Sequence, residues 1–231
     1  MRAVVYVTGL SLVAALITAP PAAESVPPEA TRLENALKGI DGLRADFVQI
    51  RDVALTGESI EATGFLAFRP PQSFRLVYSE PEAQELVIEG DFLWVVMPSE
   101  NQAQRYPFSA DAPGSEIFLL FGGQGRSLTQ VFDVLEEPWG SYPSALRLIP
   151  RDMEPGYPIE EIRLVVGKAG FPQRLFFREV SGDTVVFNFV SVRRSPKNID
   201  ELTRLQLPEG IEIIDGSPPS RTGGLPIDGD Q

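Results

Sequence analysis

Short apolar runs dominate the chain from residue 43 onwards, and each has the length of a β-strand. Turn residues such as GE, PPQ, EGD and SGD separate the runs, which recur about every 8 to 12 residues. This spacing favours an antiparallel meander in sheet or barrel form. We predict strands over residues 43–55, 60–69, 73–79, 85–89, 92–97, 102–108, 131–136, 145–150, 159–166, 173–180, 184–193 and 211–215.

Several of these runs are apolar at consecutive positions, as in FLAF (65–68) and FLWVVM (92–97). A sheet with one face in water should alternate apolar and polar residues, so the second face of these strands must also be covered. One solution is a sandwich of two sheets, and another is a single sheet curled around an interior with helices across its mouth. The pattern alone leaves both open and slightly favours the sandwich.

Two segments have helical character. Leu33, Ala36, Leu37 and Ile40 follow the i, i+3, i+4, i+7 spacing of an amphipathic helix within residues 27–41. Residues 114–130 interrupt the strand rhythm with an apolar patch over 117–121 and then two glycines, which predicts a short apolar helix followed by a flexible loop. Helices this short must dock on the sheet to persist in water.

The two ends of the chain differ from the middle. Arg2 and an apolar run over 3–19 precede small residues, which is the order of a secretory signal peptide, and we place that peptide at residues 1–23. An uncleaved membrane anchor is the alternative, but the small residues after the run suit a processed segment better. We therefore expect one mature domain over 24–216 and a disordered, Pro- and Gly-rich tail over 217–231.

Composition narrows the function classes. The 231 residues include 20 basic and 32 acidic side chains, a formal charge of −12 that repels nucleic acid. The chain has no Cys and no His, which removes thiolate nucleophiles, the usual general base and the commonest ligands of transition metals. We expect neither an enzyme nor a protein with a cofactor or bound metal.

The order of motifs over nearly the whole mature chain resembles the periplasmic outer-membrane lipoprotein carrier family, the LolA-like proteins. The stretches that carry the resemblance are LRADFVQ (43–49), GFLAFRPPQSFRLVY (64–78), EPEAQELVIEGDFLWVVMP (80–98), EIFLLFGG (116–123) and LQLPEGIEIID (205–215). The resemblance implies a mainly β (α+β) fold, an incomplete and strongly curved antiparallel barrel of about 11 strands with a helical lid over a hydrophobic cavity.

The implied function is that of a periplasmic chaperone in a Gram-negative bacterium. It would shield the acyl chains of lipoproteins, accept them from an inner-membrane LolCDE-type ABC transporter and pass them to an outer-membrane LolB-type receptor. We expect such a carrier to act as a monomer. Full burial of three acyl chains would bind too tightly for release. We therefore expect partial burial, an empty state that is collapsed or filled by the lid, or a free-energy cost of opening.

Specific residues follow from this resemblance and from the assumed strand parity, although each one taken singly is more often plain core. Arg69, which ends a strand before Pro70, is the expected lid latch, and Gly122 and Gly123 are the expected hinge. The lid side chains are Leu33, Leu37, Ile117, Leu119 and Leu120. The predicted cavity wall consists of Phe47, Phe65, Phe74, Leu76, Tyr78, Leu86, Ile88, Phe92 and Trp94.

Two other functions fit the same pattern. The protein could bind or carry another apolar ligand, such as a glycolipid or a pigment precursor, or it could be a lipid-sensing regulator of envelope stress. Bound cargo separates the first alternative from a lipoprotein carrier, because only the carrier should retain triacylated polypeptide. A sensor should bind a membrane signalling partner instead.

Overall fold

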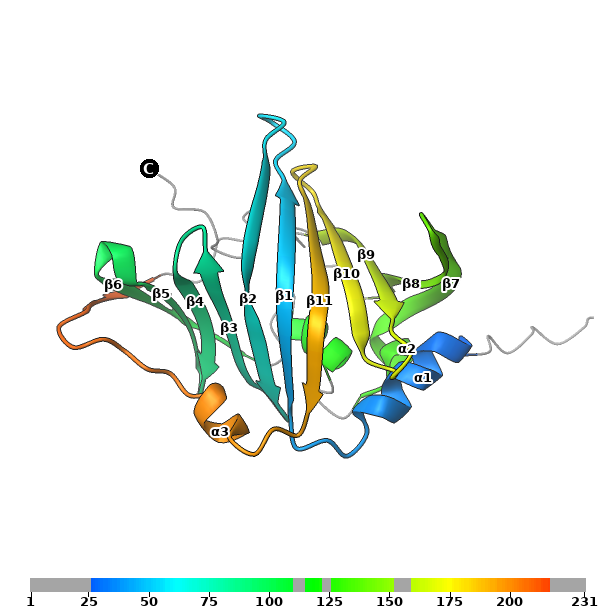
Figure 1. Ribbon diagram of the computed structural model, residues 1–231, viewed down its shortest axis with the longest axis horizontal. Coiled ribbons are helices and arrows are strands. Elements are labelled where there is room, and N and C mark those ends of the chain that lie inside the picture. The colour runs from blue at the N-terminus through cyan, green and yellow to red at the C-terminus, as the bar shows by residue number, and fades with distance from the viewer. Residues whose placement is uncertain (1–25, 110–114, 122–125, 152–158, 217–231) are drawn as a thin grey trace, which may run out of the picture.

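A single open sheet of twelve strands forms the body of the protein (Figure 1). The computed structural model describes residues 26–109, 115–121, 126–151 and 159–216. The predicted signal peptide and C-terminal tail lie outside these residues. The strand order is β12-β6-β5-β4-β3-β2-β1-β11-β10-β9-β8-β7. The strands are β1 (Leu43–Asp52), β2 (Ser59–Arg69), β3 (Ser73–Glu80), β4 (Gln84–Glu89), β5 (Phe92–Met97), β6 (Gln102–Pro107), β7 (Phe132–Trp139), β8 (Tyr142–Pro150), β9 (Ile159–Val166), β10 (Pro172–Glu179), β11 (Thr184–Arg194) and β12 (Glu212–Asp215).

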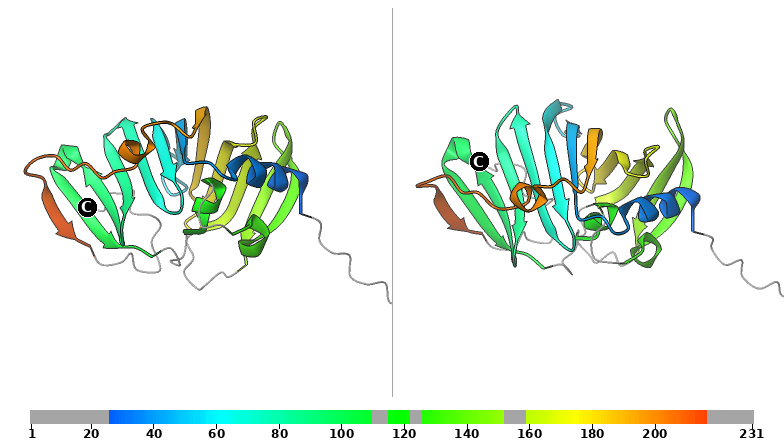
Figure 2. Two further views of the ribbon diagram at one scale, coloured as in Figure 1. Left: turned by 90° about the horizontal axis from the view of Figure 1, so that it is seen from below. Right: turned by 60° about the horizontal axis from the view of Figure 1, so that its bottom comes forward.

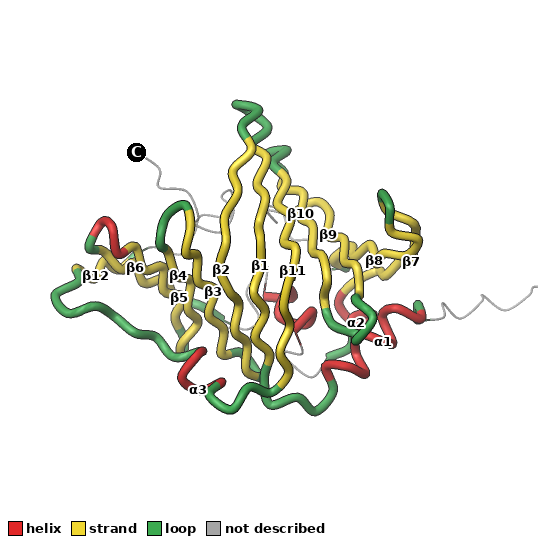
Figure 3. The backbone as a smooth tube through the Cα atoms, viewed as in Figure 1, coloured by secondary structure: helices red, strands yellow, loops and turns green. Residues whose placement is uncertain are grey.

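Most neighbouring strands are consecutive in the chain and antiparallel, as the turn spacing predicts (Figure 3). Strand β1 lies between β2 and β11 and so joins the two halves of the sheet. The exception to the antiparallel arrangement is β12, which pairs parallel to β6. The sheet arches strongly without closing (Figure 2), which confirms the mainly β, incomplete barrel. The sandwich that the pattern alone favoured is wrong, because one sheet holds all twelve strands.

Short helices accompany the sheet, namely α1 (Pro28–Leu37), the 3₁₀ turn η1 (Pro98–Glu100), the 3₁₀ helix η2 (Ser115–Phe121), α2 (Leu128–Val131) and α3 (Ile199–Leu202). Helix α1 follows the predicted amphipathic pattern, and Gly39 with φ +68° follows its C-cap residue Lys38. The apolar patch over 117–121 is helical as predicted but is 3₁₀ rather than α. The sequence pattern did not indicate α2 or α3.

The inner face of the arch carries the core. Strand register aligns its apolar side chains in rows across neighbouring strands of β1–β5. One row holds Leu43, Phe68, Phe74, Ile88 and Leu93, and the next holds Ala45, Leu66, Leu76, Leu86 and Val95.

The outer face of β2–β6 is also buried in part, which explains why these strands are apolar at consecutive positions. Ala67, Val87, Val96 and Ala103 share the outer parity and are at most 1% exposed. The segment 203–211 runs from α3 towards β12 at the far edge of the sheet (Figure 2), and the guanidinium of Arg75 donates to its backbone at Arg204 O over 3.4 Å. The chain's own C-terminal segment therefore lies against this face.

Candidate ligand-binding face

The 3₁₀ helix η2 lies inside the arch, behind β1 and β11 in the view of Figure 1. The ring of Phe118 lies 5.1 Å from that of Phe74, 6.1 Å from Phe108 and 6.2 Å from Phe68. At the other end of η2, the ring of Phe121 lies 6.0 Å from Phe189 of β11 in an edge-to-face arrangement. These aromatic contacts anchor η2 to both halves of the sheet.

Helices α1 and α2 cover the inner face of the other half. Leu33 and Leu37 of α1 and Leu128 of α2 belong to the same buried cluster as η2. The Arg32 guanidinium donates to Val166 O over 2.8 Å, and the Leu128 amide donates to the Glu34 carboxylate over 2.7 Å. The second bond satisfies an amide at the start of α2 and links the two helices.

The inner face beneath η2 is filled rather than open. Phe118, Leu120 and Phe121 are at most 6% exposed, and the inner-face rows lie directly against them. Two open pockets of ≈ 390 and ≈ 320 Å³ lie elsewhere, beside Arg69 and Asp200, and both have polar linings. Among the described residues, side chains of η2 therefore cover this part of the inner face.

Six of the nine predicted cavity residues share the inner face, namely Phe47, Phe74, Leu76, Tyr78, Leu86 and Ile88. Phe65, Phe92 and Trp94 lie on the outer face, so their assignment to the cavity wall is wrong. There the Arg44 guanidinium stands 4.4 Å from the Phe65 ring, and that of Arg105 stands 4.8 Å from the Phe92 ring. A strand that is apolar at every position gives no signal of which residues face inward.

The predicted lid residues divide between two elements. Leu33 and Leu37 lie in α1, whereas Ile117, Leu119 and Leu120 lie in η2. Sequence reasoning missed Phe118 and Phe121, which make the ring contacts of η2. The three-residue spacing of these two aromatics was the available signal, because residues i and i+3 of a 3₁₀ helix share one side. Gly122 and Gly123, the predicted hinge, lie outside the described residues.

Arg69, the predicted lid latch, lies on the outer face at the end of β2. Its guanidinium pairs with Asp200 of α3 over 3.2 Å, and both side chains are largely exposed. The physical reason is parity, because Arg69 has the outer-face phase of Ala67 and Phe65 at the end of β2. The pair therefore joins β2 to the C-terminal segment.

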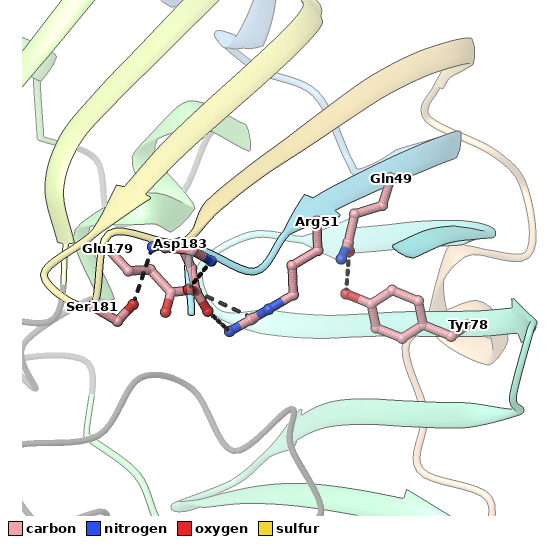
Figure 4. Close-up of polar contacts among 7 residues, drawn as sticks. Gln49, Arg51, Tyr78, Glu179, Ser181 and Asp183 are labelled. Atoms are coloured by element: carbon pink, nitrogen blue, oxygen red, sulfur yellow. Dashed lines mark hydrogen bonds and ion pairs between the residues drawn. The ribbon is translucent and has the colours of Figure 1, made fainter. Parts of the chain in front are cut away.

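A polar network links the strand turns at the end of the sheet opposite α3 (Figure 4). The buried Asp183 carboxylate accepts from Arg51 Nη2 and from the Ala54 amide, each over 2.9 Å, and so joins the β1–β2 and β10–β11 turns. Nearby on the inner face, the Tyr78 hydroxyl donates to Gln49 Oε1 over 2.6 Å. Burial raises the pKa of Tyr78 well above its usual value, against the opposing effect of the Arg51 charge.

Comparison with known proteins identifies the family of the chain. The family model for the outer membrane lipoprotein carrier protein LolA matches residues 38–202, which is most of the described chain. The chain belongs to the LolA family. Among its relatives, the outer-membrane lipoprotein carrier protein of Cupriavidus taiwanensis is 24% identical over 188 residues, covering 79% of this chain and 86% of that protein. The carrier protein of Halorhodospira halophila is 27% identical over 158 residues, covering 68% of this chain and 72% of that protein.

Among solved structures, an uncharacterized conserved protein from Thermus thermophilus has a TM-score of 0.49 to this LolA-family chain at 17% identity, covering 81% of this chain and 97% of that one. A LolA superfamily protein from Nitrosomonas europaea has a TM-score of 0.39 at 14% identity, covering 77% and 96% of the two chains. None of the helices in the described part of the chain is long and apolar enough to cross a bilayer.

Proposed function

We propose that this protein is a periplasmic carrier that shields the acyl chains of lipoproteins on their way from the inner to the outer membrane. The observation that supports it best is the position of the η2 side chains on the inner face. Phe118 and Phe121 cover apolar surface there that acyl chains would contact. Family membership supports the same role. The signal peptide at 1–23, a Gram-negative periplasm, a monomeric carrier and LolCDE- and LolB-type partners belong to this proposal.

Release explains why a carrier should fill its own site. Three acyl chains contain about 45 methylenes, and complete burial at about 0.8 kcal/mol each would give about 35 kcal/mol, beyond the practical affinity limit near 21 kcal/mol. Binding that displaces η2 must first expose Phe118, Leu120 and Phe121, which subtracts their burial from the gain. Net affinity then falls into a range that permits transfer to a receptor. In this mechanism η2 acts as the lid, and Gly122 and Gly123 act as its hinge.

The decisive experiment is depletion of the protein in its native host, followed by separation of inner and outer membranes. We expect acylated lipoproteins to accumulate in the inner membrane, and re-expression of the wild-type chain should restore their export. Protein purified from the periplasm should carry triacylated polypeptide. Unchanged lipoprotein localisation after depletion would overturn the proposal. Co-purification of small lipids alone would then indicate a carrier of another apolar ligand. Co-purification of a membrane signalling protein would indicate a sensor.

A further inference from the structure

The inner face of β1–β6 carries a row of uncharged polar side chains that the carrier role does not by itself explain. We call it the glutamine–tyrosine row. Register places Tyr78 directly opposite Gln84, and Gln102 opposite Met97, all in the same phase as the apolar rows. The name covers six side chains of the inner phase that lie at different levels of the register. Tyr78, Gln84 and Gln102 lie beyond the second apolar row, and Gln49 lies one level further, opposite Ala62. Gln104 and Tyr106 stand on β6 at the ends of the two apolar rows, opposite Val95 and Leu93.

The two halves of the sheet differ in the polarity of their inner faces. The inner face of β8–β11 is apolar at the corresponding positions, through Leu146, Leu148, Ile162, Leu164, Leu175, Phe177, Phe187 and Phe189. Gln49 and Tyr78 are buried, and the other four side chains of the row are half-buried. Buried polar groups cost free energy unless they find partners, so packing alone does not explain Gln49 and Tyr78. The polar side chains gather in one half, where a ligand would meet them.

Two hydrogen-bonded pairs organise the row. Tyr78 donates to Gln49 Oε1 over 2.6 Å between β3 and β1 (Figure 4), and Tyr106 donates to Gln104 Oε1 along β6. A glutamine amide and a tyrosine hydroxyl together hold three donor hydrogens, and their mutual bond uses one. Within the described residues, no protein group accepts the two hydrogens that each pair retains. Each pair therefore keeps donors for a ligand.

The electrostatics of the row select a neutral acceptor. Arg51 is the cation beside Tyr78, and its guanidinium is held by Asp183 over 2.9 Å and by Glu179 over 3.5 Å (Figure 4). Arg44, Arg75 and Arg105 have the opposite parity and lie on the outer face. A phosphate or free carboxylate would find its charge uncompensated here, whereas a carbonyl oxygen needs only the neutral N–H and O–H donors that the row supplies.

We propose that the glutamine–tyrosine row binds the ester and amide carbonyls that join acyl chains to the head of a bound lipid or lipopeptide. The chains themselves would lie on the apolar rows through Leu66, Leu76 and Leu86. This inference rests on the proposed carrier function and deepens it by naming the chemical group that fixes the ligand's position. Packing alone would not need polar side chains at these positions. A carbonyl group bound at a fixed place would determine how far the acyl chains extend into the arch.

The test compares ligands that differ only in their carbonyls. Two synthetic lipopeptides of equal chain length, one with ester-linked chains and one with ether-linked chains, are titrated into the full chain, with diacylglycerol and dialkylglycerol as a second pair. We expect wild type to bind the ester form about tenfold more tightly than the ether form, as one or two neutral hydrogen bonds would give. Discrimination in either pair supports the proposal and identifies which molecule supplies the carbonyls.

Variants then assign the effect to the row. Gln49→Met and Gln104→Met should each lower the ester-to-ether affinity ratio towards one, whatever the change in absolute affinity. Gln104 is only half-buried on β6, so its variant keeps the test decisive if the buried Gln49 variant does not fold. Gln173→Met, at an exposed position of β10, is the matched control and should keep the wild-type ratio.

Two negative results are distinguishable. Equal binding of ester and ether forms by wild type, or an unchanged ratio in both row variants, overturns the carbonyl site and leaves the carrier function standing. Failure of wild type to bind any of the four ligands overturns the carrier function itself, and the inference falls with it.

Discussion

At the scale of single residues, Gly64 shows how closely the sheet is fitted beneath the candidate binding face. A Cβ added at this position would stand 1.8 Å from Val77 O of the neighbouring strand and 3.0 Å from the Phe47 ring. The backbone of β2 therefore approaches β3 to a distance that only glycine permits, and the register shift between Thr63 and Gly64 lies at the same place.

We predict that Gly64→Ala lowers the free energy of unfolding by about 3 kcal/mol, because β2 and β3 must separate to admit the methyl group. Urea denaturation monitored by circular dichroism measures the change. Gly167→Ala is the control, since its Cβ would meet its nearest atoms at 3.3 and 3.4 Å and should cost less than about 1 kcal/mol. An equal loss in both variants would contradict the close-approach argument.

The face on which each side chain lies could be predicted only in part from the sequence. The residues of β3 and β4 in the predicted cavity wall face inward, but Phe65, Phe92 and Trp94 face outward. In Phe92–Met97 every position is apolar, so only pairing with β4 and β6 fixes which side chains are buried on which side. On the outer face, the guanidinium groups of Arg44 and Arg105 pack on the rings of Phe65 and Phe92. These contacts join different strands, so the local sequence does not predict them.

At the scale of elements, β8, β9 and β10 are joined on their outer face by one carboxylate among three arginines. Glu161 of β9 lies 2.6 Å from Arg163 Nε and 3.4 Å from Nε of both Arg147 and Arg178. Burial opposes ionisation of this carboxyl group, but the hydrogen bonds and positive charges of the arginines outweigh it, so the pKa of Glu161 lies below its usual value of 4.5. The charged form thus binds the three strands together.

The sign of this shift fixes a pH dependence. A carboxyl group whose pKa is lower in the folded chain stabilises it above its ordinary value of 4.5, and the contribution disappears as the pH falls through the lower folded value. We predict that Glu161→Gln loses about 1 kcal/mol at pH 7 and that the difference from wild type vanishes in acid. Glu160→Gln, at the exposed neighbouring position, serves as control. A difference that persists unchanged below pH 3 would contradict the assignment.

Elements were predicted from the sequence far better than their contacts. The strand runs and the i, i+3, i+4 stripe of α1 are local signals, and the structure has both. Helix α3 has four residues and the segment 203–211 has no periodicity, so neither gave a signal, although together they pair with Arg69 and Arg75 and lie against the outer face. Which face of the sheet an irregular segment covers depends on the tertiary path of the chain. The local sequence pattern does not encode that path.

At the scale of the whole molecule, the proposed carrier function makes η2 and an acyl ligand compete for the same part of the inner face. Phe118 is the residue on which this competition depends most, because its ring meets Phe68, Phe74 and Phe108 while remaining 6% exposed. A side chain that only stabilises the fold and a side chain that also excludes ligand respond differently to truncation, which makes the two roles separable.

We predict that Phe118→Ala lowers the free energy of unfolding by about 3 kcal/mol and at the same time raises the affinity for the apolar dye N-phenylnaphthylamine several-fold, because the space it vacates becomes available to the dye. Phe132→Ala is the matched control, since Phe132 is equally apolar and 0% exposed but lies on β7, at the opposite edge of the sheet from β12 and outside the ring contacts of Phe118. It should lose similar stability without gaining affinity. If both variants bind the dye equally, general loosening of the core explains the binding, and η2 does not compete with the ligand.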